Sequence, residues 1–198
     1  MAMSTPHATA LDEQPFRWGT TLSLFDPQRM ALGVALPDKQ SALQEIGRLG
    51  QRRFGPGAAE IVRLLARREA RGSTALGRGA ALPHADVPRL RAPVAIFLQV
   101  EPGIHFGASD GIPVSNILAL LVPRPATAAH FELLSRLTQR FRHPALREEL
   151  GLCTDPQLVC ELLSRWCDPA SRDTRTWAAL PNRHRGPGHR DDSEVGRW

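Results

Sequence analysis

Residues 113–122, PVSNILALLV, decide the fold of this chain. The stretch closes on six consecutive apolar residues, 117–122, and a strand that is apolar on both faces is typical of the interior of a sheet. A second apolar run at 94–100, VAIFLQV, lies between Pro93 and Pro102 and predicts another strand. These two runs indicate a sheet that is covered on both faces.

Further elements are expected on either side of these two strands. Residues 29–35 predict a first strand, and residues 80–82 predict a short strand that stops at Pro83. Apolar spacing and end signals predict helices from 37–38 to a stop at 54–57, at 58–71, at 127–141, at 144–150 and from 155–156 onward. Helices both before and after the strands predict an α/β fold, a three-layer α/β/α sandwich with a small mixed β-sheet.

Length and composition indicate one globular domain. The 198 residues fit a single domain of ordinary size, and a hydrophobic fraction of 42% supplies a core. We expect a loose N-terminal lead-in at 1–21, the domain at 22–168 and a disordered basic tail at 169–198. The tail is rich in Arg, Pro, Gly and Asp and has no periodicity.

The charge pattern favours a solvated surface over a nucleic-acid interface. The formal net charge is +5, but arginines are spread along the chain without interleaved aromatic residues. No apolar run approaches the ~20 residues that a membrane span needs. Three cysteines and an N-terminus without the build of a signal peptide predict a cytoplasmic protein without membrane insertion.

His84 is the sharpest candidate for chemistry. It follows Pro83, and two glycine-containing stretches, Gly-Ser-Thr at 72–74 and Gly-Arg-Gly at 77–79, precede it. Such small residues let the backbone approach a ligand and leave N–H groups free for an oxyanion or phosphate. Neutral imidazole is a nucleophile that titrates near neutral pH. On the residues alone, a structural role for this histidine stays the alternative.

A longer pattern surrounds this histidine. Residues 68–85 hold Arg-Glu, then Gly-Ser-Thr, then a short strand ending in Pro-His, and this block resembles the signature of fructose/mannitol-type enzyme IIA domains of the bacterial phosphotransferase system. The similarity continues in order at 106–114, 120–123 and 130–134. It covers roughly residues 22–165, and the layout is most similar to the standalone nitrogen-regulatory type.

The resemblance implies roles for individual residues. His84 matches the phosphorylated histidine, His130 the second active-site histidine, and Arg68 the arginine near the phosphate. Backbone N–H groups around Ser73 and Thr74 are expected to help bind phosphate. No metal or other cofactor is implied. The structural alternatives are a packed histidine at a helix start, a solvated arginine and simple turn formers.

The implied function is that of a phosphoryl carrier which accepts phosphate from the histidine phosphocarrier protein onto His84. A regulatory use is favoured because this chain holds no enzyme IIB or membrane segment, and its readers would be regulatory target proteins. One alternative is a sugar-transport component that passes phosphate to an enzyme IIB domain. Another is a non-catalytic binding module that uses the arginine-rich surface and the tail.

The sequence departs from the family pattern in two places. Asp86 stands just after the site, where relatives often carry a basic residue. Its negative charge is expected to weaken docking to an acidic partner or to destabilise the phosphorylated form. Ser115 and Asn116 interrupt an otherwise apolar strand, and relatives often carry a carboxylate at the first of these positions.

Overall fold

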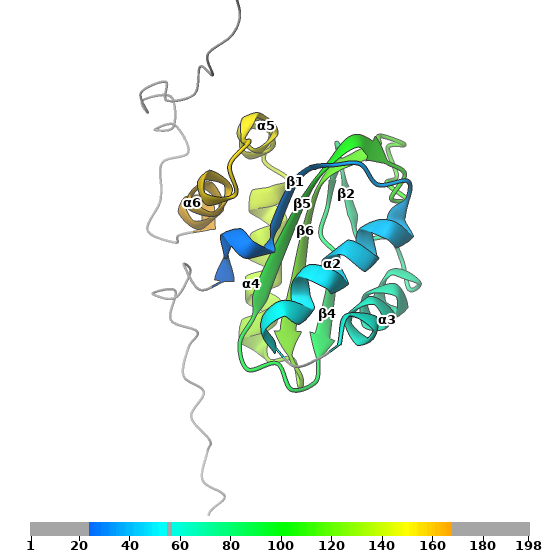
Figure 1. Cartoon of the computed structure of the whole chain (residues 1–198), viewed down its shortest axis with the longest axis vertical. Helices are drawn as coiled ribbons and strands as arrows, with labels where there is room; N and C mark the ends of the chain where they lie inside the picture. Colours follow the sequence, from blue (N-terminus) through cyan, green and yellow to red (C-terminus); the bar gives the residue numbers. More distant parts are fainter. Residues whose placement is uncertain (1–23, 55–56, 168–198) are drawn as a thin grey trace, which may run out of the picture.

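The computed structural model describes residues 24–54 and 57–167. The lead-in predicted at 1–21 and the tail predicted at 169–198 lie outside these residues. Figure 1 shows one β-sheet with helices α2 (Lys39–Phe54) and α3 (Ala58–Glu69) on one face. Helices α4 (Ala128–Phe141), α5 (Pro144–Leu152) and α6 (Pro156–Cys167) lie on the opposite side. The predicted three-layer α/β/α sandwich is confirmed.

The sheet is mixed, and strand β6 (Val114–Pro123) is its centre. Its strand order is β1-β5-β6-β3-β2, with β4 also pairing with β6. The pair β5–β6 is antiparallel, whereas β1 runs parallel to β5 and both β3 and β4 run parallel to β6. The remaining strands are β1 (Met30–Val34), β2 (Ala75–Gly77), β3 (Ala80–Ala81), β4 (His84–Val87) and β5 (Val94–Ile104).

Two strand boundaries differ from those predicted. Strand β5 passes through Pro102 to Ile104, because the register with β6 shifts between Gln99 and Ile104 and the proline is not needed as a ladder donor there. The chain does not leave the sheet at Pro83 either. His84 begins a separate strand, β4, and Pro83 still joins the sheet through its carbonyl, which accepts from Leu120 N–H at 2.9 Å.

The helices begin where capping side chains allow. Asp38 Oδ1 accepts from the Ser41 N–H at 2.8 Å ahead of α2, and Asp155 Oδ1 accepts from the Gln157 N–H at 2.8 Å ahead of α6. Helix α3 ends at Glu69, two residues before the predicted end at Arg71. A short 3-10 helix, η2 (Pro27–Arg29), precedes β1.

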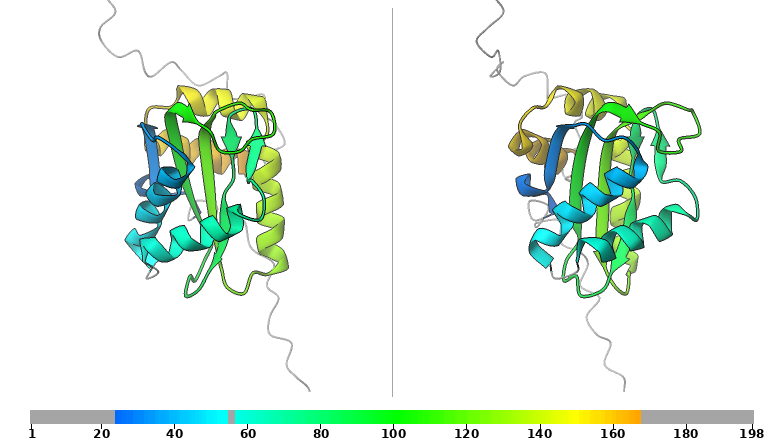
Figure 2. Two further views of the ribbon diagram at one scale, coloured as in Figure 1. Left: turned by 90° about the vertical axis from the view of Figure 1, so that its right-hand side faces the viewer. Right: turned by 45° about the vertical axis from the view of Figure 1, so that its right-hand side comes forward.

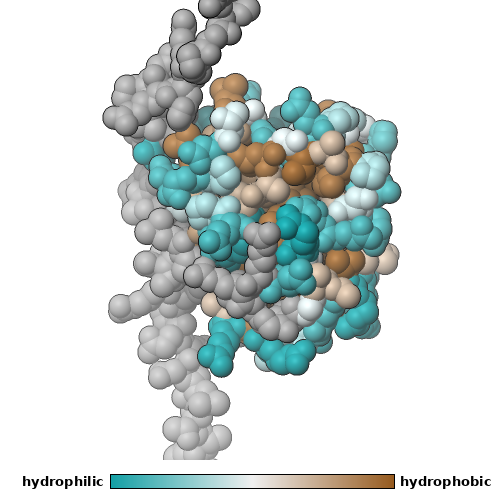
Figure 3. All heavy atoms as spheres, in the orientation of Figure 1, coloured by the Kyte–Doolittle hydropathy of each residue, from teal (hydrophilic) through white to brown (hydrophobic). Residues whose placement is uncertain are grey.

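Each face of the sheet has its own core. Alternation along the strands sends Ile96 and Leu98 toward α2 and α3, and sends Ala95 and Phe97 toward α4, α5 and α6. Figure 2 shows both helical layers against the strands from two further sides. The face drawn in Figure 3 carries hydrophilic side chains around apolar ones. In the part of the chain described, no helix combines the length and apolarity that a membrane crossing needs.

Phe97 should contribute strongly to stability. Its ring is fully buried and meets Phe141 edge-on, with centroids 6.4 Å apart. We expect Phe97→Ala to lower the free energy of unfolding by about 3–5 kcal/mol, because the change removes apolar contacts and leaves a cavity. Urea denaturation measures the loss. As a matched control, Ile112→Ala should cost much less, since Ile112 is 46% exposed.

Candidate functional site

His84 lies at the first position of β4, and its two ring nitrogens have different partners. Nδ1 is 3.0 Å from the carbonyl oxygen of Leu82. Because a carbonyl only accepts, we assign the ring hydrogen to Nδ1. Nε2 then keeps its lone pair and accepts from Nε–H of Arg68 at 3.0 Å. This tautomer leaves Nε2 as the nucleophilic atom, directed at a cation.

The surroundings favour the neutral form of this imidazole. Burial is the largest cause that lowers the pKa of His84 below its ordinary value of 6.5. The hydrogen bond to Leu82 and the charge of Glu69 oppose that effect, and the positive charge of Arg68 reinforces it. A neutral ring at pH 7 is the form in which imidazole can act as a nucleophile.

Arg68 is held from the opposite direction. It belongs to the last turn of α3, and its Nη1 donates to the carbonyl of Gly72 at 3.1 Å, in the turn that follows. The guanidinium therefore bridges this turn and the ring of His84. Arginine stays protonated at any physiological pH, so a permanent positive charge lies beside Nε2.

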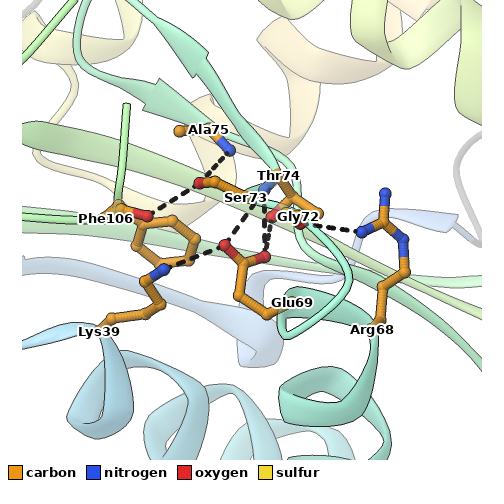
Figure 4. A network of polar contacts seen from close by, with 8 residues as sticks. All are labelled: Lys39, Arg68, Glu69, Gly72, Ser73, Thr74, Ala75 and Phe106. Atoms are coloured by element: carbon orange, nitrogen blue, oxygen red, sulfur yellow. Dashed lines mark hydrogen bonds and ion pairs between the residues drawn. The ribbon is translucent and has the colours of Figure 1, made fainter. Parts of the chain in front are cut away.

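The neighbouring Glu69 points into the protein, where it organises the turn (Figure 4). Thr74 donates its backbone N–H to both carboxylate oxygens at 3.1 Å and its hydroxyl to Oε2 at 2.6 Å. Lys39 Nζ pairs with Oε1 at 3.1 Å and lies 5.1 Å from the centre of the Phe106 ring. These donors satisfy a carboxylate that is only 6% exposed.

This network corrects one expectation about the turn at 72–74. The backbone N–H of Thr74 is not free, because the buried carboxylate of Glu69 takes it together with the hydroxyl. Ser73 Oγ donates to the carbonyl of Phe106 at 2.9 Å and accepts from Ala75 N–H at 3.2 Å. Neither Ser73 nor Thr74 lines the cavity at His84. Nearby residues in the sequence and Phe106 take up these groups, and phosphate binding by the backbone N–H of Ser73 stays a prediction.

A cavity of about 550 Å³ opens at His84, between α3, β4, the end of β6 and the start of α4. It brings together the three residues that the sequence suggested as the chemical centre, His84, Arg68 and His130. Its charged lining also includes Arg67, Arg71, Asp86 and Arg124. Arginines therefore dominate the charge around the neutral ring.

His130 combines a structural contact with a place in this cavity. It is the third residue of α4, and its Nδ1 accepts from Thr127 N–H at 3.1 Å in a capping box. We assign the ring hydrogen to Nε2, which leaves an N–H donor that the cap does not use. Burial lowers the pKa of His130 below its ordinary value. His130 therefore caps the start of α4 and also lines the cavity, while its role in phosphoryl transfer stays a prediction.

Two features of the lining were not foreseen from the sequence. Arg124 donates two hydrogen bonds to the carboxylate of Asp86, from Nε to Oδ2 at 2.7 Å and from Nη2 to Oδ1 at 3.3 Å. The negative charge noted in the sequence is thus compensated by a residue 38 positions away. Phe131 follows His130 and is 64% exposed at the cavity. An apolar ring among cations is typical of a surface that contacts a protein.

Metal chemistry has no evident centre in this region. Within residues 24–54 and 57–167, no group of three His, Cys, Asp or Glu side chains is arranged to hold a metal ion. The three cysteines at 153, 160 and 167 are not paired in disulfides, and burial is the main cause that raises their pKa values. Such thiols behave as small apolar side chains.

Comparison with known protein families identifies the class of protein to which this fold and this cavity belong. The family model for the phosphoenolpyruvate-dependent sugar phosphotransferase system, EIIA 2, matches residues 23–166. The chain belongs to this family and is thus a phosphotransferase-system component of the enzyme IIA kind.

Individual relatives are named for regulation and for transport. A nitrogen regulatory protein of Escherichia coli is 36% identical over 133 residues, which cover 66% of this chain and 81% of that protein. One from Bradyrhizobium diazoefficiens is 29% identical over 71% of this chain and 92% of its own length. A fructose-specific EIIA component of Haloferax volcanii is 31% identical over 50% of this chain and 65% of that protein.

Solved structures agree on the fold. The nitrogen regulatory protein IIA-Ntr of Neisseria meningitidis superposes with a TM-score of 0.68 at 32% identity, covering 72% of this chain and 97% of that one. The mannitol IIA of Escherichia coli superposes with a TM-score of 0.58 at 22% identity over 70% of this chain and 98% of that one, which supports the fold alone.

The protonation of His84 provides a direct check of the site. We expect its titration midpoint to lie below 6.5, because burial and the charge of Arg68 outweigh the opposing contacts. Two-dimensional NMR of ¹⁵N-labelled histidine rings measures both the midpoint and the tautomer. The spectrum should show hydrogen on Nδ1 for His84 and on Nε2 for His130. The opposite tautomer for His84 would contradict the assigned nucleophile.

Proposed function

We propose that this protein is a phosphoryl carrier that accepts a phosphoryl group on Nε2 of His84 from the histidine phosphocarrier protein. The observation that supports this most is the pair of contacts on one ring, with Leu82 fixing hydrogen on Nδ1 and Arg68 facing Nε2. A nucleophile, its tautomer and a cation for the incoming charge are thereby supplied by three neighbouring groups.

The transfer step needs no other reactant. The lone pair of His84 Nε2 forms a bond to phosphorus, while the nitrogen–phosphorus bond on the donor's histidine breaks and its electron pair returns to that nitrogen. The ring of His84 keeps its hydrogen on Nδ1, where Leu82 stabilises the charge that the ring acquires. Such transfers depend mainly on alignment and charge neutralisation, because both ends of the reaction are phosphoimidazoles.

Arg68 and His130 supply that neutralisation. As phosphate arrives, the Nε–H of Arg68 can leave Nε2 and donate to a phosphoryl oxygen, since the guanidinium remains anchored at Gly72 through Nη1. His130 also lines the cavity, and its Nε2–H, which the helix cap does not use, is a second candidate donor to the phosphoryl oxygens. Donors fixed before the reaction stabilise developing charge without reorganisation at the moment of transfer.

The relatives favour a regulatory use within this role. Five relatives by sequence carry the name nitrogen regulatory protein, as does the structural relative from Neisseria meningitidis. We propose that the phosphorylation state of His84 is read by regulatory target proteins in the cytoplasm. Transfer to an enzyme IIB domain is the alternative, and a complex of mannitol IIA with phosphorylated IIB exists for a distant structural relative.

Phosphoryl labelling tests this proposal. Incubation with radiolabelled phosphoenolpyruvate, enzyme I and the phosphocarrier protein should label the wild type, and His84→Ala should remain unlabelled. The label should be stable in alkali and hydrolyse in acid, which is the behaviour of phosphohistidine. As a matched control, His105→Ala should label normally, because His105 is exposed and does not line the cavity. Equal labelling of the His84→Ala variant would contradict the proposal.

The rim of the cavity should influence donor binding. The guanidinium groups of Arg67 and Arg71 have no hydrogen bond or ion pair in the described part of the chain, and both line the cavity beside the exposed Phe131. Unpaired cations around an apolar ring raise encounter rates with an acidic surface, and salt weakens that attraction.

We expect Arg67→Glu combined with Arg71→Glu to raise the KM for the phosphorylated donor by about tenfold, with a smaller effect on the maximal transfer rate. The reason is that these side chains act on docking and do not contact the ring of His84. Initial rates of phosphoryl transfer, measured at several donor and salt concentrations, give KM. Arg142→Glu is the control, since it lies at the far end of α4, ~18 Å from His130. An unchanged KM would exclude this role of the rim.

A further inference from the structure

Asp86 lies on the same face of β4 as His84. Ala85 stands between them and is buried on the other side of the strand. His84 and Asp86 both line the cavity. Residues two apart on a strand are about 7 Å apart. A phosphoryl group on His84 would carry about two negative charges, as other phosphorylated side chains do. A bare carboxylate at this distance opposes that charge.

Arg124 removes this conflict. It follows directly on β6, beside the end of β4, where Val87 pairs with Pro123. Besides its two bonds to the carboxylate, Nη2 donates to the backbone oxygen of Asp86 at 3.1 Å, so three contacts fix its orientation. The hydrogen bond from Arg124 is the largest cause that lowers the pKa of Asp86, and the charge of Arg71 contributes less, so the carboxylate is ionised at neutral pH.

We propose that Arg124 is a positioning residue for phosphoryl transfer, which pairs with Asp86 so that no uncompensated carboxylate faces the phosphoryl group on His84. This inference rests on the proposed function of His84. Arg124 acts through Asp86, whereas Arg68 acts on the ring and the phosphate directly. The other charged or titratable groups that line the cavity, Arg67, Arg71 and His130, are cationic or can become so.

The size of the effect follows from the balance of the reaction. Donor and acceptor are both phosphoimidazoles, so the transfer equilibrium lies close to even and small electrostatic differences shift it. Loss of Arg124 places one unpaired negative charge near a group with two. We expect a five- to tenfold loss in the transfer equilibrium constant, about the value for charges ~7 Å apart in a water-like dielectric.

A double-mutant cycle tests the inference. Arg124→Ala should lower the fraction of protein phosphorylated at equilibrium with a limiting amount of phosphorylated donor. Arg124→Ala combined with Asp86→Asn should restore that fraction to near the wild-type level, because the conflicting charge is gone. Asp86→Asn alone should phosphorylate at least as fully as the wild type. The control is Arg48→Ala, which breaks the Arg48–Glu45 pair on α2, away from the cavity.

A second readout does not need the phosphoryl donor. An unpaired carboxylate stabilises the protonated ring, so NMR titration should show a higher pKa for His84 in Arg124→Ala than in the wild type. The pKa should return in the double variant. A purely structural role of Arg124 would not predict this return.

The outcomes separate this inference from the proposed function. If the wild type takes no label, the carrier function fails, while the titrations still decide whether Arg124 shields His84 from Asp86. If the wild type is labelled and both variants lacking Arg124 lose label equally, Arg124 acts on the phosphate or the donor itself, and the inference is overturned. An Arg124→Ala variant that matches the wild type in labelling and titration overturns it as well.

Discussion

Glu69 ends α3 inside the protein, where its carboxylate accepts from the backbone N–H and the hydroxyl of Thr74 and pairs with Lys39. A buried carboxylate without donors is costly, so this arrangement fixes the turn after α3 firmly. Thr74 then accepts from the N–H of Leu82 at 3.0 Å, and Leu82 in turn holds Nδ1 of His84. The orientation of the ring therefore depends, through this series of hydrogen bonds, on one internal ion pair.

The same turn resolves two requirements that oppose each other. A phosphoryl acceptor must stay neutral to be a nucleophile, yet the group that it accepts requires positive charge nearby. Adjacent positions on α3 divide these tasks. Glu69 reaches Thr74 and Lys39 and builds the turn, as Figure 4 shows, whereas Arg68 lines the cavity and donates to His84 Nε2. Burial and Arg68 both lower the pKa of His84, so the cation that awaits phosphate also keeps the acceptor unprotonated.

The sequence predicts much of this because its strongest signals are local. The apolar run in β6 and the helical stripes lie within short segments, and the fold and the helices follow from them. The Pro-His motif is local too, and it draws attention to His84 without knowledge of the cavity. The pair between Asp86 and Arg124 joins residues 38 positions apart, so no spacing rule reveals it. The Thr74 N–H looked free for the same reason, since a turn sequence does not show that a buried carboxylate binds it.

The carboxylates of Glu69 and Asp86 also differ in their effect on folding stability and on the charge of the site. In the pair of Lys39 and Glu69 the carboxylate is buried, and removing its partner would leave a buried charge that disturbs the fold. The pair of Asp86 and Arg124 is nearly half exposed, 44% and 45%, so it contributes little to folding stability. Its three aligned contacts lie where phosphate would arrive, and their consequence is for the charge of the site rather than for the fold.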